Sequence, residues 1–540
     1  MLSRRRFLLQ SGLLAGAAAL GAGGAPAVAK RRPNILFCFA DDWGRYAGCY
    51  READRPTVND CVATPHIDGT AQEGVLFENA FMGVPSCTPS RASVSTGSYF
   101  WRCGRAANLR IETWEGAADP GDALPGFGTL LADAGYHLGM TYKCFQRKWF
   151  PSKNYMGAGK DFCEYSQTAT AAANPEAAKA ALLEEVRANF RAFLADRAEG
   201  APFCYIFGPH NCHRPWTRGS GKALWGIEPD DLEGRLPAFL PDVPVVREDF
   251  ADYLGEVQAW DAAVGLLMEE VARLGELDDT LVVLSGDNGM PGMPRGKCNL
   301  YDFGVAAPLV VRWPKGVPHP GRRVADFTNL MDLAPTFLEA AGLKAPGSMD
   351  GRSLAPLLAS ERDGQVDPSR DAVFTGRERH VPAAREGALP YPSRAVRTKD
   401  WLYIRNFKPE RWPLGVPGEM PAPGDEAADL SYGQTYRSFP DLDGGPTKHC
   451  FIVRREAAAV APLFRLGFGR RPAEELYDLR ADPDQVRNVA DDPAHGEVKA
   501  ALAARLERVM RETGDPRLSD AFDAPPYVEP DPPERLKDRI

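Results

Sequence analysis

Hard oxygen ligands follow two apolar runs of this chain. Asp41 and Asp42 come directly after one run, and Asp287 and Asn288 follow another. Carboxylates held close together repel one another and raise each other's pKa unless a cation neutralises them. No cysteine and histidine cluster with zinc spacing accompanies them, and such oxygen ligands suit Ca2+ or Mg2+. The sequence therefore predicts a divalent-cation site, with Ca2+ as the first choice and Mg2+ as the alternative.

Two further apolar runs end in residues that can bind anions or transfer protons. Lys143 follows the run at 136–142, and His210 and His213 follow the run at 203–207. In open α/β sheets, ligands bind beyond the carboxyl ends of the strands. We therefore expect all four strand ends to meet at one edge of a sheet and to form the functional site there.

The elements that must position these residues alternate along the chain. Strands are predicted at 34–40, 136–142, 203–207, 280–285 and 308–313, and helices at 124–134, 176–197 and 248–274. This alternation predicts an α/β fold, a mostly parallel sheet flanked by helices on both faces. The pattern then changes to short strands at 394–397 and 401–405, followed by a Pro/Gly-rich stretch at 409–446. We interpret this part as a smaller C-terminal α+β module with a long surface loop.

One motif narrows the chemistry further. The chain reads Cys87-Thr-Pro-Ser-Arg91-Ala-Ser-Val-Ser-Thr-Gly97. The pattern Cys-x-Pro-x-Arg, with Thr-Gly after four more residues, resembles the first signature of the type I sulfatases of the alkaline phosphatase superfamily. The resemblance implies that Cys87 is oxidised to Cα-formylglycine by a formylglycine-generating or an anaerobic sulfatase-maturating enzyme. Outside such a motif, a cysteine at a helix start is more often a buried structural residue.

The implied modification has a physical rationale. A hydrated aldehyde is a geminal diol, and one of its hydroxyls, once deprotonated beside a metal ion, is a strong nucleophile toward sulfur. The second hydroxyl can then expel sulfate by re-forming the aldehyde. A helix N-terminus favours an anionic diol and sulfate. Arg91 lies one helical turn after Cys87 and can face the same pocket.

The resemblance covers nearly all of residues 33–495 and implies roles for the other candidates. It implies an alkaline-phosphatase-like fold in which Asp41, Asp42, Asp287 and Asn288, with residue 87, hold the cation. It implies catalytic roles for Cys87 and Arg91 of the motif. It also implies that Lys143 and Lys297 contact sulfate and that His213 protonates the leaving group. One position departs from the family: many relatives carry a histidine two residues after the second-signature lysine, and this chain has Phe145. Which residue assists the leaving group is therefore left open. A role for Phe145 as part of a pocket wall is the alternative.

The substrate is less well defined by the sequence. The segments 209–215, 236–253 and 287–301 look most like those of sulfamidases, which cleave N-sulfoglucosamine, but bacterial carbohydrate sulfatases share them. N–S and O–S cleavage therefore both stay open, with a sulfated carbohydrate as the expected partner. Arg377 and His380, in an Arg-Glu-Arg-His run, are either a solvated charge run or substrate-binding residues at the pocket mouth. We expect His210 to bind substrate as well.

Two other functions remain alternatives at this point. One is a phosphomonoester or phosphodiester hydrolase that uses the same metal site. The other is a non-catalytic glycan-binding protein, which Phe145 motivates. The chain has 64 basic and 73 acidic residues and a net charge of -9, which argues against nucleic-acid binding over its whole surface.

The first 29 residues have the pattern of a targeting signal. An Arg4-Arg5-Arg6 run precedes a short apolar stretch and an Ala-x-Ala site ending at Ala29, which resembles a twin-arginine signal peptide. The expected location is periplasmic or secreted, with the twin-arginine export machinery as a partner. A membrane anchor is the alternative, although no later segment approaches the length of a stable membrane span. We accordingly expect a signal peptide at 1–29, a catalytic domain at 30–390 and the C-terminal module at 391–540.

Overall fold

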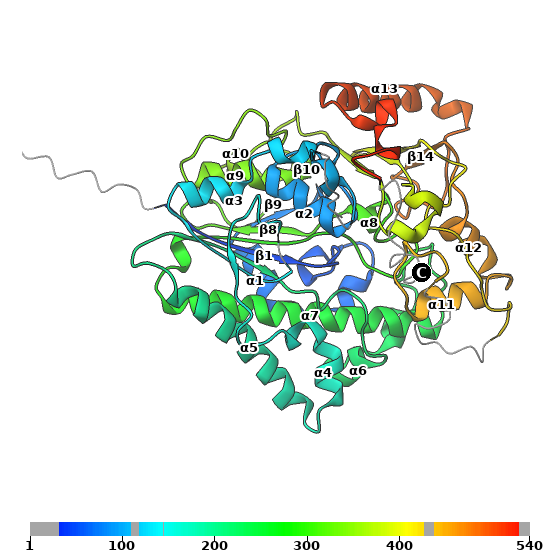
Figure 1. The fold of residues 1–540 in the computed structure, drawn as a ribbon. Coiled ribbons are helices and arrows are strands. Elements are labelled where there is room, and N and C mark those ends of the chain that lie inside the picture. The colour runs from blue at the N-terminus through cyan, green and yellow to red at the C-terminus, as the bar shows by residue number, and fades with distance from the viewer. Residues whose placement is uncertain (1–31, 110–117, 144, 426–436, 529–540) are drawn as a thin grey trace, which may run out of the picture.

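A large mixed sheet lies at the centre of the molecule (Figure 1). The computed structural model describes residues 32–109, 118–143, 145–425 and 437–528, so the predicted signal peptide lies outside the described residues. The strand order is β5 (Lys153–Asn154), β4 (His137–Tyr142), β6 (Phe203–Gly208), β1 (Asn34–Ala40), β7 (Thr280–Gly286), β8 (Leu309–Arg312), β2 (Val75–Phe77) and β9 (Arg322–Val324). Only β8 among these strands runs antiparallel to its neighbours. The predicted mostly parallel sheet is confirmed.

Helices cover both faces of this sheet, as Figure 1 shows. Side chains of β1 alternate between the faces: Leu36 and Cys38 pack in one core cluster, and Phe37 and Phe39 in another. The first face is covered by α1 (Pro65–Gln72), α4 (Tyr165–Ala171), α5 (Pro175–Ala195), α6 (Ser220–Trp225) and α7 (Pro244–Arg273), and the second by α2 (Cys87–Thr96), α3 (Phe127–Asp133), α9 (Leu333–Ala340) and α10 (Ala355–Leu358). Burial on both faces explains why the strands read as continuous apolar runs.

A second, antiparallel sheet forms the smaller module. Its strands are β11 (Ala372–Arg377), β12 (Ser393–Thr398), β13 (Trp401–Asn406) and β14 (Glu474–Asp478), in that order. Helix α13 (Gly496–Glu512) packs on it through Leu502, Leu506 and Met510. The predicted α+β module is confirmed. Strand β11 precedes the boundary expected at 390/391 but pairs along its length with β12.

The long surface loop predicted at 409–446 is wrong in part. Leu414, Phe439 and Leu442 are at most 2% exposed and belong to the same core cluster as α7. Helix α11 (Pro446–Val453), which follows directly, also packs against α7. The proline and glycine residues predicted irregular structure, but they did not predict its location. The apolar side chains between them bury the described part of this segment in the interior.

Two further properties concern the described residues as a whole. None of their helices has both the length and the apolar character needed to cross a membrane. Cys38 and Cys204 are free thiols buried in core strands.

Candidate active site

Strands β1 and β7 place the four predicted oxygen ligands side by side. Ala40 pairs with Gly286 at the ends of these parallel strands, so Asp41 and Asp287 leave the sheet together. The backbone N–H of Asp42 donates to Asp287 Oδ1 at 3.0 Å. A Cβ at Gly286 would collide with the carbonyl oxygen of Trp43, which explains the glycine at this position. The predicted meeting of strand ends is thus present in the fold.

The three carboxylates are buried, which makes their ionisation costly. Asp41, Asp42 and Asp287 are each at most 1% exposed. Burial raises the pKa of Asp42, and burial together with the charge of Asp41 raises the pKa of Asp287 to about 6. Burial also opposes ionisation of Asp41, but the charges of Lys143, His213 and neighbouring cations outweigh it and hold the pKa of Asp41 well below its usual range.

The donor set fits a hard divalent cation. Asp41 Oδ1 and Asn288 Oδ1 are buried oxygens without a hydrogen-bond partner. The Asn288 Nδ2 group donates to Asp42 Oδ1 at 2.6 Å and to Asp287 Oδ1 at 2.5 Å. Turning the amide over would direct its oxygen to the same place, beside the three carboxylates. Oxygen donors gathered in this way match the preference of Ca2+ and Mg2+.

Cys87 lies beside this oxygen cluster, at the first residue of α2. Its Sγ, an Asp41 oxygen and an Asp287 oxygen all lie within 4.8 Å of one another. Burial raises the pKa of the Cys87 thiol to about 12. Because the thiolate is the nucleophilic form, an unmodified thiol here would be a poor nucleophile at neutral pH. Arg91, one turn later, donates from Nε to Asp287 Oδ2 at 2.8 Å.

Two lysines and a histidine surround the same carboxylates. Lys143 Nζ lies 2.5 Å from Asp41 Oδ2, and Lys297 Nζ lies 2.8 Å from Asp42 Oδ2. Burial disfavours the charge of each lysine, but the adjacent aspartate prevails and raises the lysine pKa. His213 Nε2 is 3.7 Å from Asp42 Oδ2, while its Nδ1 is bonded to the carbonyl of Arg214. Nε2 is therefore the ring nitrogen that faces the site.

A cavity of about 450 Å3 opens beside these residues. Its lining consists of Asp41, Tyr142, Lys143, Met156, Lys160, His210 and His213. Burial lowers the pKa of His210 to about 4, so its ring is neutral at physiological pH. The volume falls in the range of small-molecule sites. His210 thus lines this cavity together with Lys143 and His213, and its role in binding substrate stays a prediction.

Arg377 and His380 lie elsewhere than predicted. The Arg377 side chain is buried, and its guanidinium donates to Asp441 Oδ2 and to the carbonyl of Cys298, both at 2.5 Å. His380 is also buried, and its Nδ1 shares a 2.8 Å hydrogen bond with Ser86 Oγ, next to Cys87. Neither residue lines the cavity described above. Their placement at its mouth is therefore wrong: the Arg377 charge is paired with Asp441 in the interior, and burial lowers the pKa of His380 to about 3, so its ring is neutral there.

Phe145 does not form a pocket wall either. It is 3% exposed and stacks with Phe37 and Phe39 in the core cluster beneath the sheet. Its ring lies near the Arg91 guanidinium, 6.0 Å from ring centre to Cζ. The hydrophobic core has taken this position, so Phe145 contributes no polar group to the site.

Sequence reasoning missed Asp443. Its Oδ2 lies 3.5 Å from Lys297 Nζ, which places a fourth carboxylate at the site. The only signal in the sequence is an acidic Asp441-Leu-Asp443-Gly-Gly turn within the stretch interpreted as a surface loop. Nothing local indicates that this turn folds back over a lysine more than a hundred residues earlier.

Comparison of the sequence with known proteins identifies matching family models and a related human protein. The family model described as Sulfatase matches residues 33–343, more than half of the chain, and one described as N-sulphoglucosamine sulphohydrolase, C-terminal, matches 296–414. Human N-sulphoglucosamine sulphohydrolase is 28% identical over 517 residues, covering 90% of this chain and 92% of that protein.

Solved structures share the fold at lower identity. A protein in complex with its substrate D-glucosamine-2-N,6-O-disulfate aligns with a TM-score of 0.58 and 19% identity, over 90% of this chain and 98% of that one. The phosphonate monoester hydrolase of Agrobacterium radiobacter aligns with a TM-score of 0.59 and 19% identity, over 90% and 97%. The fold therefore occurs with both sulfur and phosphorus substrates.

Proposed function

We propose that this chain, which belongs to the sulfatase family, releases sulfate from a carbohydrate through an oxidised cysteine at position 87 and a bound divalent cation. The chain is a sulfuric ester hydrolase. One observation carries the proposed mechanism: Cys87 begins α2 within 4.8 Å of carboxylate oxygens from both strand ends, where an unmodified thiol is held protonated.

The nucleophile is the hydrated aldehyde of residue 87. One hydroxyl, after losing its proton, attacks sulfur and forms a new O–S bond, while the S–O or S–N bond to the sugar breaks. The second hydroxyl then loses its proton, the bond between residue 87 and the sulfate oxygen breaks, and sulfate leaves as the aldehyde re-forms. Water restores the diol. Arg91 and the N-terminus of α2 stabilise the anionic forms of this group.

The oxygen cluster would hold the cation. Asp41, Asp42, Asp287 and Asn288 would bind it with residue 87, and Ca2+ or Mg2+ would supply positive charge that lowers the pKa of the diol and attracts the sulfate oxygens. Lys143 and Lys297 flank the cluster within hydrogen-bond distance of its carboxylates. Their ammonium groups can therefore reach the outer oxygens of a sulfate seated there and orient it for attack.

His213 is the proposed acid for the leaving group. Its Nδ1 is held by the Arg214 carbonyl, which leaves Nε2 facing both the carboxylates and the cavity. A proton on Nε2 can pass to the departing sugar oxygen or nitrogen as the bond to sulfur breaks. His210, on the same cavity wall, would contact the sugar.

The proposed substrate class is supported by the relatives and not by the fold. The human relative is named for N-sulfoglucosamine, and a structural neighbour binds a glucosamine that carries both N- and O-linked sulfate. These two support a sulfated amino sugar, with N–S and O–S cleavage both within reach of the chemistry above.

Maturation and export complete the proposal. Cys87 is 4% exposed in the folded chain, so a maturation enzyme has to act before folding. The twin-arginine motif at residues 4–6 favours export of the folded protein to the periplasm or beyond. Maturation in the cytoplasm would then precede export.

Turnover of matched chromogenic substrates tests this function. Enzyme co-expressed with a maturation enzyme should release para-nitrophenol from the sulfate ester faster than from the corresponding phosphonate ester. Cys87→Ala should abolish release, whereas Cys61→Ala, at a half-buried thiol away from the site, should retain it. A preference for the phosphonate would favour a phosphorus hydrolase, and glycan binding without sulfate release would indicate a non-catalytic protein.

A further inference from the structure

We propose that Asp443 is a substrate-binding residue that accepts a hydrogen bond from a hydroxyl or amine of the sugar carrying the sulfate. The inference rests on the proposed function and extends it to the part of the substrate that remains after sulfate leaves. It gives the smaller module a direct part in choosing the substrate.

The surroundings of Asp443 suggest a ligand. Asp443 Oδ2 has no hydrogen-bond partner, although its side chain is only 23% exposed. Lys297 Nζ lies 3.5 Å away but makes its shorter contact, 2.8 Å, with Asp42. A buried carboxylate oxygen without a donor is costly. A donor supplied by the substrate would satisfy it.

Electrostatics decides which part of the substrate this could be. A carboxylate repels the sulfate group, so Asp443 cannot bind the anion itself. Burial opposes its ionisation, but Lys297, His213 and His380 outweigh that effect and hold the pKa of Asp443 well below its usual range. Asp443 is therefore charged and acts only as an acceptor. Its natural partners are O–H, N–H or ammonium groups, which a sugar presents and a sulfate does not.

The turn that carries Asp443 is held on one side by the contacts of Asp441. The Asp441 carboxylate binds Arg377 at 2.5 Å and Arg385 at 2.6 Å, and it also accepts from the backbone N–H of Val381 at 2.8 Å. This accounts for the buried position of Arg377. The residue predicted to touch substrate instead fixes the turn that carries Asp443.

The other side of the turn is fixed by Arg214. The Arg214 guanidinium forms two hydrogen bonds with Asp249, at 2.8 and 2.7 Å, and a Cβ at Gly445 would collide with it. Gly445 thus lets the turn pass close to the residue after His213. Asp443 is accordingly supported at both ends, as a specificity-determining group must be.

The position of Asp443 relative to His213 indicates which substrate group donates a hydrogen bond to it. His213 Nε2 lies 3.7 Å from Asp42 Oδ2, and the Lys297 ammonium that contacts this same oxygen lies 3.5 Å from Asp443 Oδ2, so His213 and Asp443 both adjoin the Lys297–Asp42 pair. For a sulfamate, the atom leaving sulfur is the nitrogen itself, which departs as an amine and binds a carboxylate strongly once protonated. For a sulfate ester, a hydroxyl or amine next to the reacting oxygen would fill the same role.

The experiment compares two substrates in the matured enzyme. The measured quantity is the ratio of kcat/KM for a sulfated sugar to kcat/KM for para-nitrophenyl sulfate, which has no sugar donors. The sugar is the one wild type hydrolyses fastest among glucosamine N-sulfate, glucosamine 6-sulfate and their disaccharides. Asp443→Ala should lower this ratio at least about tenfold, mainly through a higher KM for the sugar. Asp443→Asn, which keeps a carbonyl acceptor, should lower it less.

Controls separate the possible failures. Asp425→Asn, at an exposed aspartate of the same module, should leave the ratio unchanged. Equal losses on both substrates in the two Asp443 variants would show that Asp443 serves only as a counter-ion to Lys297 and would overturn the inference. Absence of sulfate release from every sugar by wild type, despite aryl sulfate turnover, would instead refute the carbohydrate function on which the inference rests.

Discussion

At the scale of single residues, the site is a balance of buried charges. Asp41, Asp42 and Asp287 are almost wholly enclosed, and each has a cation against it in the form of Arg91, Lys143 or Lys297. A buried charge without a partner would destabilise the folded chain. Each of these ion pairs therefore stabilises the fold and also positions a group of the proposed active site.

Arg91 should therefore tolerate no conservative replacement. Arg91→Lys loses the fork that reaches Asp287 and the carbonyls of Phe39 and Lys143, and we expect kcat/KM to fall roughly 10–100-fold. Steady-state kinetics on para-nitrophenyl sulfate measures the loss. Arg102→Lys, at a more exposed arginine paired with Asp350, is the matched control. Equal activity of both variants would contradict a role for Arg91 in orienting the site.

The carboxylates make a prediction about cation binding that does not depend on turnover. A Ca2+ ion held by Asp41, Asp42 and Asp287 would bind only the folded chain and should stabilise it by about 2.7 kcal/mol when its free concentration is 100 times Kd. Thermal unfolding in Ca2+ and in EDTA measures the shift.

Asp41→Asn removes one ligand charge and should reduce that shift, whereas Asp54→Asn, at an exposed aspartate, should not. The same melting temperature with Ca2+ and with EDTA would argue against a resident cation.

At the scale of elements, the ends of adjacent strands create the site. β1 and β7 pair along their full length, so residues far apart in sequence leave the sheet at one level. Asp42 takes a left-handed backbone conformation there, with φ of 60°, which is unfavourable for a residue other than glycine. Such local strain is typical of functional sites.

Gly286→Ala tests this close approach of strand and turn. The added methyl would meet the Trp43 backbone two positions from Asp41, and we expect a loss of about 1–3 kcal/mol of stability together with reduced activity. Urea denaturation and turnover should fall together. In Gly347→Ala the added methyl faces open space, so wild-type behaviour is expected. A fully stable and active Gly286→Ala protein would refute the packing argument.

The elements also show why sequence reasoning succeeded or failed. Apolar runs and the residues that end them are local features, so the strands and the positions of Asp41, Lys143, His213 and Asp287 could be predicted. Arg377 looked exposed because its partner, Asp441, lies in a segment whose burial no local pattern reveals. Asp443 was missed for the same reason.

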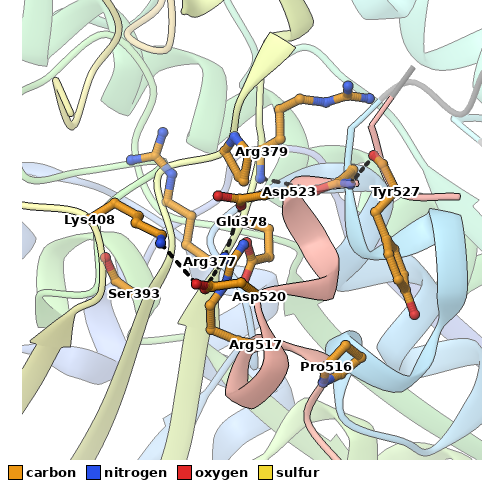
Figure 2. A network of polar contacts seen from close by, with 12 residues as sticks. Arg377, Glu378, Arg379, Ser393, Lys408, Pro516, Arg517, Asp520, Asp523 and Tyr527 are labelled. Carbon is orange, nitrogen blue, oxygen red and sulfur yellow. Dashed lines mark hydrogen bonds and ion pairs between the residues drawn. The ribbon is translucent and has the colours of Figure 1, made fainter. Parts of the chain in front are cut away.

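At the scale of the whole molecule, a buried cluster of charges ties the C-terminal segment to the antiparallel sheet of the smaller module. Glu378 follows β11 and is paired with Arg394 and with Arg517, all with fully buried side chains. Figure 2 shows Arg517 reaching Glu378 from the segment that also carries Asp520 and Asp523. This cluster fixes the chain between Arg377 and His380, and through Asp441 it supports the turn that carries Asp443.

Arg517→Ala should therefore destabilise the folded chain strongly. Glu378 would keep Arg394 but lose half of its compensation, and we expect about 3 kcal/mol lower stability by urea denaturation. Arg511→Ala breaks an exposed pair with Glu507 and should cost less than about 1 kcal/mol. A similar small effect of both variants would mean that the buried cluster is not what holds the C-terminal segment.

The central claim concerns the chemical identity of residue 87. The most direct test is mass spectrometry of the tryptic peptide that contains it, on protein purified from its native host, combined with sulfate-ester turnover of the same samples. The account predicts an aldehyde in place of the thiol and a turnover rate proportional to the fraction of aldehyde. Full turnover by protein in which Cys87 is an unmodified thiol would contradict it.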